Sequence, residues 1–245
     1  MTPQTLYVIN HSGGKDSQAM TAWLAARIPH DQLIVIHAPL GRIEWAGTIS
    51  HIEDTKPPDV PLLLAHVASG KDLLQRIEER GKFPDKGRRW CTSDYKRGPI
   101  EREIRHYLAA HPEYGGRVVN CMGIRADESR DRAKAQALKL NPRNSKAGRV
   151  WWDWLPIHSW TLADVLNQVE RVNQRLHWAY EAGMTRLSCS FCILASQKDL
   201  RTAARLRPDL YHEYVALEQR INHTLSPSRK PLPMIVDGHD QLPIF

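Results

Sequence analysis

The chain has 245 residues, of which 42% are hydrophobic and 25% are charged, and its net charge is +7. This length and composition are those of a globular protein with one large or two small domains, and they exclude intrinsic disorder, a collagen-like repeat and a coiled coil. The sequence has neither the ~20 consecutive apolar residues of a membrane span nor the regions of a signal peptide, so we expect a cytoplasmic protein without a membrane partner.

The first two thirds of the chain alternate predicted strands with predicted helices. Short apolar, β-rich runs predict strands at Thr5–Asn10, Leu33–His37, Val60–Val67, Arg117–Met122 and Val150–Ile157. Helix-forming composition and helix-ending residues predict helices at Ser17–Arg27, Lys71–Arg80 and Pro99–Ala110. This alternation is typical of βαβ units, so we predict an α/β domain with a mainly parallel sheet and helices on both of its faces.

The last third of the chain changes to a helical pattern. Thr161 and Asp164 have the spacing of a capping box, and apolar residues keep helical spacing from Leu162 to Val172. Pro208 opens a second amphipathic helix, and the sequence after Leu225 is rich in proline. We therefore expect an α/β domain over residues 1–157, a helical extension over 158–225 and an irregular tail over 226–245.

The strongest chemical signal lies between the first strand and the first helix, at His11–Ser17 (HSGGKDS). Gly13 and Gly14 allow a tight turn that presents backbone N–H groups, and the helix N-terminus adds its positive dipole end, a combination that suits a phosphate or sulfate. Lys15 supplies a positive charge, whereas Asp16 indicates that magnesium or a hydroxyl group is positioned here as well. The spacing differs from that of a Walker A loop.

The segment Ser12–Ser17 (SGGKDS) resembles the PP-loop, S-G-G-x-D-S, of the adenine nucleotide alpha-hydrolase superfamily. Further blocks make the chain similar to the phosphoadenosine phosphosulfate (PAPS) reductase family, with its DNA phosphorothioation relatives. These blocks are Trp90–Lys96 (WCTSDYK), Gly123–Ser129 (GIRADES), Leu155–Ile157 with Trp160, and Cys189–Cys192 (CSFC). The blocks occur in the family's order over about residues 5–200, and the resemblance implies a Rossmann-like sheet.

The resemblance also implies a nucleotide site at the carboxyl ends of the strands, where open α/β sheets bind ligands. The implied nucleotide-binding residues are Ser12, Gly13, Gly14, Lys15, Asp16, Ser17, His37, Ala38, Gly123 and Arg125. Of these, Lys15, Asp16 and Arg125 are expected to act catalytically, with Arg125 at the anionic end of the nucleotide. The alternative role for Arg125 is a surface salt bridge with Asp127 or Glu128.

The chain has four cysteines, Cys91, Cys121, Cys189 and Cys192. Four thiolates can hold a [4Fe–4S] cluster or a structural zinc ion, and the resemblance favours iron because some members of the family are iron–sulfur proteins. The tandem cysteine pair of the cluster-bearing reductases is absent here. Free thiols or a redox pair at Cys189 and Cys192 remain an alternative, and Cys121 has the alternative of a buried strand cysteine.

Basic residues cluster in two stretches of the sequence. Eight Lys and Arg residues face three acidic residues between Arg125 and Arg149, and a second cluster runs from Lys82 to Arg97. Such clusters suit a nucleotide or a nucleic acid, here tRNA or DNA, or else form a solvated basic face. Trp151, Trp152, Trp154 and Trp160 form an aromatic patch that either stacks on bases or belongs to the core.

Two departures from the family affect the predicted reaction. Reductases that convert PAPS or adenosine phosphosulfate (APS) into sulfite carry a nucleophilic cysteine near the C-terminus, and no cysteine follows Cys192. The aspartate-bearing turn often found after the second strand is also missing. We therefore favour an enzyme that uses Mg²⁺ and ATP for adenylation or sulfur transfer, with a thiol or sulfur donor protein as a further partner. The alternatives are a sulfonucleotide reductase with an unusual thiol donor, and a nucleotide-binding accessory subunit without turnover.

Overall fold

The computed structural model describes residues 4–238, which fall into two compact units. The first unit comprises the chain up to Pro39 together with Gly47–Ala65 and Gly98–His177. The second unit comprises Leu40–Ala46, His66–Arg97 and the chain from Trp178 onward. No helix among residues 4–238 combines the length and the apolar composition that crossing a bilayer requires.

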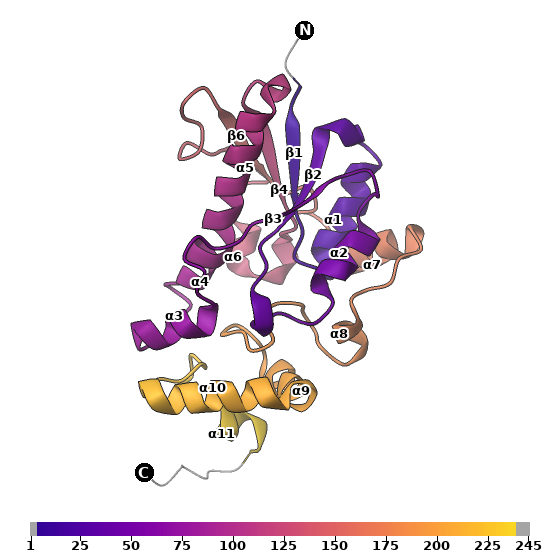
Figure 1. Ribbon diagram of the computed structural model, residues 1–245. Coiled ribbons are helices and arrows are strands. Elements are labelled where there is room, and N and C mark those ends of the chain that lie inside the picture. The colour runs from indigo at the N-terminus through magenta and orange to yellow at the C-terminus, as the bar shows by residue number, and fades with distance from the viewer. Residues whose placement is uncertain (1–3, 239–245) are drawn as a thin grey trace. The chain divides into compact units, whose positions relative to one another are not determined.

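The first unit contains a six-stranded sheet in the order β3-β2-β1-β4-β6-β5 (Figure 1). The strands are β1 (Leu6–Asn10), β2 (Leu33–His37), β3 (Leu62–Leu64), β4 (Arg117–Met122), β5 (Leu138–Leu140) and β6 (Val150–Trp154). All neighbouring strands are parallel except β5, which pairs antiparallel with β6. The predicted mainly parallel α/β sheet is confirmed, and β5 is an addition that the sequence did not indicate.

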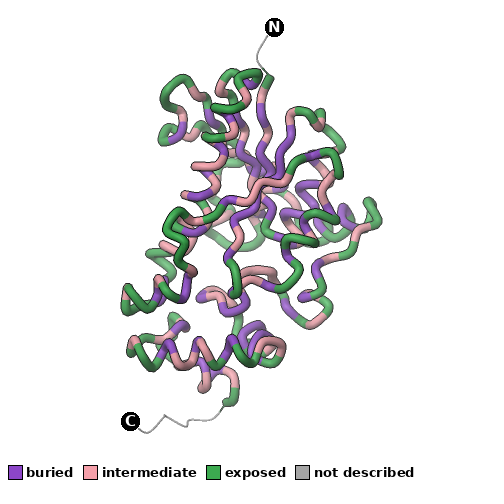
Figure 2. The backbone as a smooth tube through the Cα atoms, viewed as in Figure 1, coloured by how far each residue is buried: buried purple, intermediate pink, exposed green. Residues whose placement is uncertain are grey.

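Helices cover both faces of this sheet, as Figure 1 shows. They are α1 (Lys15–Ala25), α2 (Thr48–Thr55), α5 (Gly98–Ala110) and α7 (Leu162–Arg171), and the unit also contains the short helix α6 (Arg130–Ala133), none of whose residues is buried. Alternate residues of β1 face opposite ways, so Ile9 packs with α1 and α7 while Val8 packs with Ile104 of α5. Purple segments predominate in the central strands in Figure 2, as this double cover requires, and all five residues of β2 are buried.

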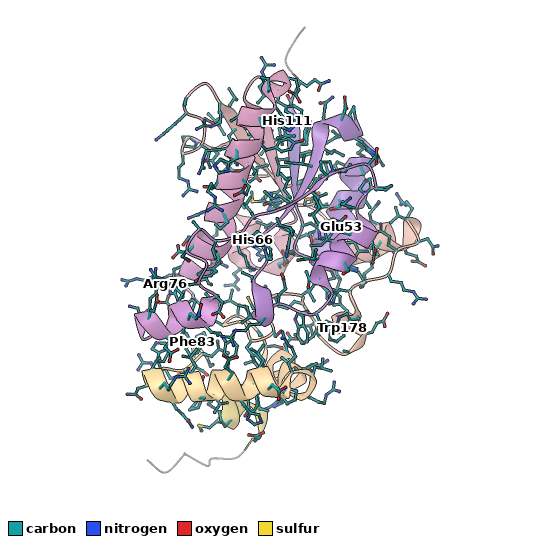
Figure 3. All side chains as sticks on the ribbon, in the orientation of Figure 1. Glu53, His66, Arg76, Phe83, His111 and Trp178 are labelled. Atoms are coloured by element: carbon teal, nitrogen blue, oxygen red, sulfur yellow. The ribbon has the colours of Figure 1, made fainter. Side chains whose placement is uncertain are left out.

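The second unit is helical. Its helices are α3 (Leu73–Arg80), α4 (Trp90–Thr92), α8 (Trp178–Glu181), α9 (Gln197–Leu206), α10 (Pro208–Ile221) and α11 (Leu232–Val236), and a π-helical turn covers Ser93–Arg97. Phe83, labelled in Figure 3, stacks on Tyr214 of α10 with a ring-centroid distance of 6.2 Å. Arg207 holds the 40–46 segment by donating to the carbonyl oxygens of Arg42 and Glu44.

The division into units corrects the expected domain boundaries. The helix α7 was predicted to open a helical extension after residue 157, but it packs on α1 in the first unit. Segments 40–46 and 66–97 were placed in the α/β domain, but their apolar residues share a core with α9 and α10. The tail expected to be irregular from residue 226 contains α11, and residues 239–245 of that prediction lie outside the described part of the chain.

Candidate functional site

The loop Ser12–Ser17 joins β1 to α1 at the carboxyl edge of the sheet. Gly13 has a φ of 76°, a conformation that glycine adopts without the steric cost of a side chain. Gly14 is the N-cap of α1, and no side chain caps this helix. The first N–H groups of a helix have no partner within the helix, so the loop can present donors to an anion.

Hydrogen bonds within the loop fix its shape. The Ser17 hydroxyl donates to the carbonyl oxygen of Gly14 at 2.8 Å and accepts from the Ser12 N–H at 3.2 Å. Ser17 is buried, whereas Ser12 is exposed. Ser17 therefore has a structural part in holding the loop, and Ser12 is the hydroxyl open to a ligand.

Gly123 lies directly against the start of α1. A Cβ atom at Gly123 would lie 3.1 Å from the Ser17 nitrogen and 3.2 Å from the Asp16 carbonyl carbon, both of which are backbone atoms. Glycine at this position thus allows the end of β4 to approach the loop closely. The structure brings Gly123 to the loop, where the sequence predicted it.

Charged residues of the predicted site form one connected group in the first unit. The Arg125 Nε donates to Asp16 Oδ1 at 2.5 Å, and the Arg125 Nη1 donates to both Asp127 oxygens at 2.5 and 2.6 Å. The Lys15 Nζ lies 3.7 Å from Asp16 Oδ2. Arg125 is only 5% exposed. The guanidinium thus occupies a buried position between two carboxylates, which goes beyond the surface salt bridge considered from the sequence.

Two histidines lie at the base of the loop: His11, which precedes it, and His37, which the family resemblance placed at the nucleotide site. The Gly13 N–H donates to His11 Nδ1 at 3.0 Å, so the neutral His11 ring carries its proton on Nε2. His37, at the end of β2, donates from Nδ1 to the His11 carbonyl oxygen at 2.8 Å. Burial, together with the nearby charges of His51 and His37, lowers the pKa of His11 to about 3. The Nε2 of His11 is buried without a hydrogen-bond partner among residues 4–238.

Three of the four cysteines, Cys91, Cys189 and Cys192, belong to the second unit. All three are partly buried. Burial raises the pKa of Cys189 to about 12, the charges of Cys192 and Cys91 act in the same direction, and Lys96 opposes them. The same two influences, burial first and then the charge of Cys192, raise the pKa of Cys91. The three thiols are thus close enough to affect one another's pKa.

Cys121 has a different environment. It is fully buried on β4, and its side chain packs in the core between the sheet and helices α1 and α7. Its thiol lies 3.7 Å from the carbonyl oxygen of Val119, and burial raises its pKa. Cys121 therefore has the environment of a buried strand cysteine, the alternative that the sequence left open for it. Among residues 4–238, no three His, Cys, Asp or Glu side chains form a preorganised metal site.

The sequence matches a family model over most of its length. Residues 6–195 match the phosphoadenosine phosphosulfate reductase domain. The chain belongs to this family. The family resemblance predicted from the SGGKDS loop is thereby confirmed, together with the Rossmann-like α/β fold that the sheet order shows.

Two curated relatives of this PAPS reductase family member are themselves called uncharacterized. An uncharacterized protein of Methanocaldococcus jannaschii is 29% identical over 220 residues, which is 89% of this chain and 49% of that protein. An uncharacterized 37.8 kDa protein of Escherichia phage 186 is 28% identical over 132 residues, 54% of this chain and 38% of that protein. The chain thus spans half or less of the length of these curated relatives.

Two solved structures are similar in part. The PAPS reductase of Candida auris in a phosphate complex has a TM-score of 0.48 and 11% identity, covering 75% of this chain and 80% of that one. The FMN adenylyltransferase of Candida glabrata with FAD and pyrophosphate has a TM-score of 0.47 and 15% identity, covering 77% of this chain and 56% of that one.

Proposed function

We propose that the chain is an enzyme that binds Mg²⁺ and ATP at the Ser12–Ser17 loop and activates the α-phosphate for adenylation or sulfur transfer. In the adenylation step a substrate oxygen attacks the α-phosphorus, the bond from that phosphorus to the bridging oxygen breaks, and pyrophosphate leaves. The observation that carries the proposal is the loop at the helix N-terminus with Lys15, Asp16 and Arg125 connected beside it.

The carboxylates of the site favour a nucleotide that arrives with a metal ion. Asp16 and Asp127 both flank Arg125, and carboxylates beside a phosphate repel it unless a cation lies between them. Mg²⁺ characteristically combines one or two protein carboxylates with substrate phosphates and water. Asp16 is the expected protein ligand because it belongs to the loop itself. Lys15 and Arg125 would then stabilise the charge that develops on the phosphates.

Calorimetric titration with Mg·ATP and, separately, with PAPS tests this proposal. We expect ATP to bind in a Mg²⁺-dependent manner, and Lys15→Met to weaken it by about tenfold or more, the effect of one lost charge-assisted contact. Lys198→Met, at an exposed site on α9, is the matched control and should bind as the original chain does. Tight PAPS binding with weak ATP binding would instead support the sulfonucleotide reductase. Nucleotide binding without any product would support the accessory subunit.

We further infer that Cys91, Cys189 and Cys192 bind a [4Fe–4S] cluster through three thiolates, with zinc as the alternative metal. Thiolates are the preferred ligands of such a group, and Cys91 and Cys189 pack against an apolar cluster that includes Phe191. Such a cluster would supply an iron site to which sulfur can bind. Lys96, close to the thiols, would offset part of the negative charge.

Iron and sulfide analysis of anaerobically purified protein tests the thiol site independently of activity. We expect iron, sulfide and visible absorption in the original chain, and their loss in Cys189→Ala. Cys121→Ala is the matched control, because it removes a thiol of the first unit and should keep the iron. Zinc in place of iron would identify a structural site, and neither metal would leave a pair of free thiols. Loss of iron in Cys121→Ala with retained folding would restore the four-thiol set.

A further inference from the structure

One face of the β5–β6 hairpin is left uncovered in the first unit. Residues that pair directly across an antiparallel ladder lie on the same face, and here Leu138 pairs with Trp154 and Leu140 with Trp152. This is the face that α1 and α7 cover at the centre of the sheet. At its edge the apolar side chains stay open: Leu138 is 55% exposed, Leu140 46% and Trp152 38%.

The exposure is specific to that face. Trp151, the neighbour of Trp152, points to the opposite face, where it is fully buried against the side chains of α5. Val150 shares the face of Trp152 and is 46% exposed. We call the side chains of Leu138, Leu140, Val150 and Trp152 the hairpin face. An aromatic ring and three aliphatic side chains on paired strands form a platform whose backbone is held in place by the ladder.

The hairpin face belongs to a region with several cations that have no acidic partner in the described part of the chain. Arg117 pairs with Val150 across the ladder, so it lies on the same face, and it is exposed. The other cations belong to residues 125–154, which lead into the hairpin and form it, and which we call the arm. One of them, Lys139, pairs with Asp153 across the ladder and therefore lies on the opposite face of the hairpin. No ion pair among residues 4–238 involves Arg117, Arg130, Lys134, Lys139, Lys146 or Arg149.

The acidic residues of the same arm are already neutralised or hydrogen-bonded, with one exception. Asp127 pairs with Arg125, and Glu128 pairs with Arg132. Asp153 accepts hydrogen bonds from Asn120, Asn141 and the Trp151 indole. Asp131 is the exception. The hairpin therefore combines an exposed apolar platform with a clear excess of positive charge, which selects a polyanion that also carries flat apolar groups.

We propose that the hairpin face binds single-stranded nucleic acid, with bases stacked on Trp152 and phosphates held by Arg117 and the cations of the arm. Single strands offer unstacked bases to an aromatic ring, and their phosphates match the unpaired cations. The inference rests on the proposed function in one respect, because it names the class of acceptor for the nucleotide chemistry. The binding itself can be measured without any nucleotide.

A second copy of the chain is a poorer occupant of this edge. Two β5 strands joined edge to edge in an antiparallel pair centred on Lys139 would place the two ammonium groups opposite each other, which destabilises the pairing. A lysine on an exposed edge strand is a known protection against such pairing. The positive charge of both copies would add to the repulsion.

Fluorescence anisotropy with labelled oligonucleotides tests the proposal on the full chain. The probes are a 15-nucleotide dT strand, a 15-nucleotide rU strand and a 15-base-pair duplex, each from 50 to 300 mM NaCl. We expect both single strands to bind more tightly than the duplex, and their comparison distinguishes DNA from RNA. Trp152→Ala should weaken binding at least about 5-fold, the lower bound for one lost stacked base. Trp152→Phe keeps an aromatic ring and should restore most of the affinity.

Charge variants test the second half of the proposal. Neutralising two phosphate contacts in Arg117→Gln/Lys146→Gln should reduce the slope of log K against log salt by about 1.4. Lys198→Gln/Lys230→Gln removes two exposed cations of the second unit and is the matched control. Leu166→Ala, at a 41% exposed leucine on α7, controls for the loss of exposed apolar surface. Circular dichroism of each variant establishes that it is folded.

Several outcomes would overturn the inference. They are the absence of single-strand binding at 50 mM NaCl, unchanged affinity in folded Trp152→Ala, and tighter binding of the duplex. Binding to vesicles of phosphatidylcholine and phosphatidylserine without oligonucleotide binding would show a membrane surface instead. A dimer that Trp152→Ala dissociates, seen by sedimentation, would show a self-association surface. Oligonucleotide binding without Mg·ATP binding would refute the proposed function and leave the hairpin site standing.

Discussion

Gly123→Ala is predicted to place a methyl group against the backbone at the start of α1. The added Cβ would lie 3.1 Å from the Ser17 nitrogen and 3.2 Å from the Asp16 carbonyl carbon and the Ser17 Cα. These are backbone atoms at the start of α1, so no side chain can rotate away. Gly123 does not have a positive φ, so alanine adds no backbone strain. The predicted effect is overpacking alone, which costs about 1–3 kcal/mol.

The substitution should also weaken nucleotide binding, because the added methyl group would displace Asp16 and Ser17 of the proposed phosphate-binding loop. We expect a lower urea midpoint for the first unit and a Mg·ATP affinity reduced about tenfold or more, a cost within the same range. Gly87→Ala is the control, since its Cβ would meet a single side-chain oxygen, of Asp85, at 3.4 Å. A Gly123→Ala chain with both quantities unchanged would refute the close approach of β4 to the loop.

Two further predictions concern stability. Burial, and then the charges of His51 and His37, lower the pKa of His11 to about 3. The neutral ring therefore contributes its full stabilisation above pH 6.5, the pKa of histidine in the unfolded chain. As the pH falls from 6.5 toward 3, the free energy of unfolding should decrease by on the order of 1.4 kcal/mol per pH unit. The urea midpoint should be level from pH 8 to 6.5 and fall from pH 6.5 to 5, and His11→Asn should reduce that fall; an equal fall in both proteins would contradict the prediction. Asp199 is fully buried and accepts from the Thr185 N–H, the Thr185 hydroxyl and the Ser196 hydroxyl, so Asp199→Ala should cost about 2–4 kcal/mol at pH 7 in urea unfolding, with a midpoint near that of the original chain contradicting it.

The central strands and their helices could be predicted from the sequence because burial dictates their composition. Strand β2 is Leu33–His37 in both the prediction and the structure, and all its residues are buried. The capping box predicted at Thr161 and Asp164 is formed in full. The edge strand β5 was missed because its three residues, LKL, are all exposed and make no strand pattern by themselves. Its pairing with β6 is a long-range property that local sequence does not encode.

In the candidate site, too, the contiguous residues could be predicted from the sequence and the long-range contacts could not. The loop was predictable because its glycines and charged residues are contiguous, whereas Arg125 reaches Asp16 across 109 positions of sequence. His37 was placed at the site by the family resemblance, whereas His51, whose charge lowers the pKa of His11, comes from α2 and belongs to no motif. Cys121 was grouped with the other thiols by residue type, although it shares with Val119 the face of β4 that packs against α1 and α7, as a core residue does.

The interleaved path of the chain has a consequence for dissecting the protein. The second unit takes Leu40–Ala46 and His66–Arg97 from within the α/β half of the sequence, and joins them to the chain after His177. A fragment ending at His177 would retain Leu73, Ile77 and other apolar side chains of those segments without α9 and α10 to cover them. Such a fragment is expected to aggregate. The PP-loop half is therefore better studied by point substitution in the intact chain than by expressing it alone.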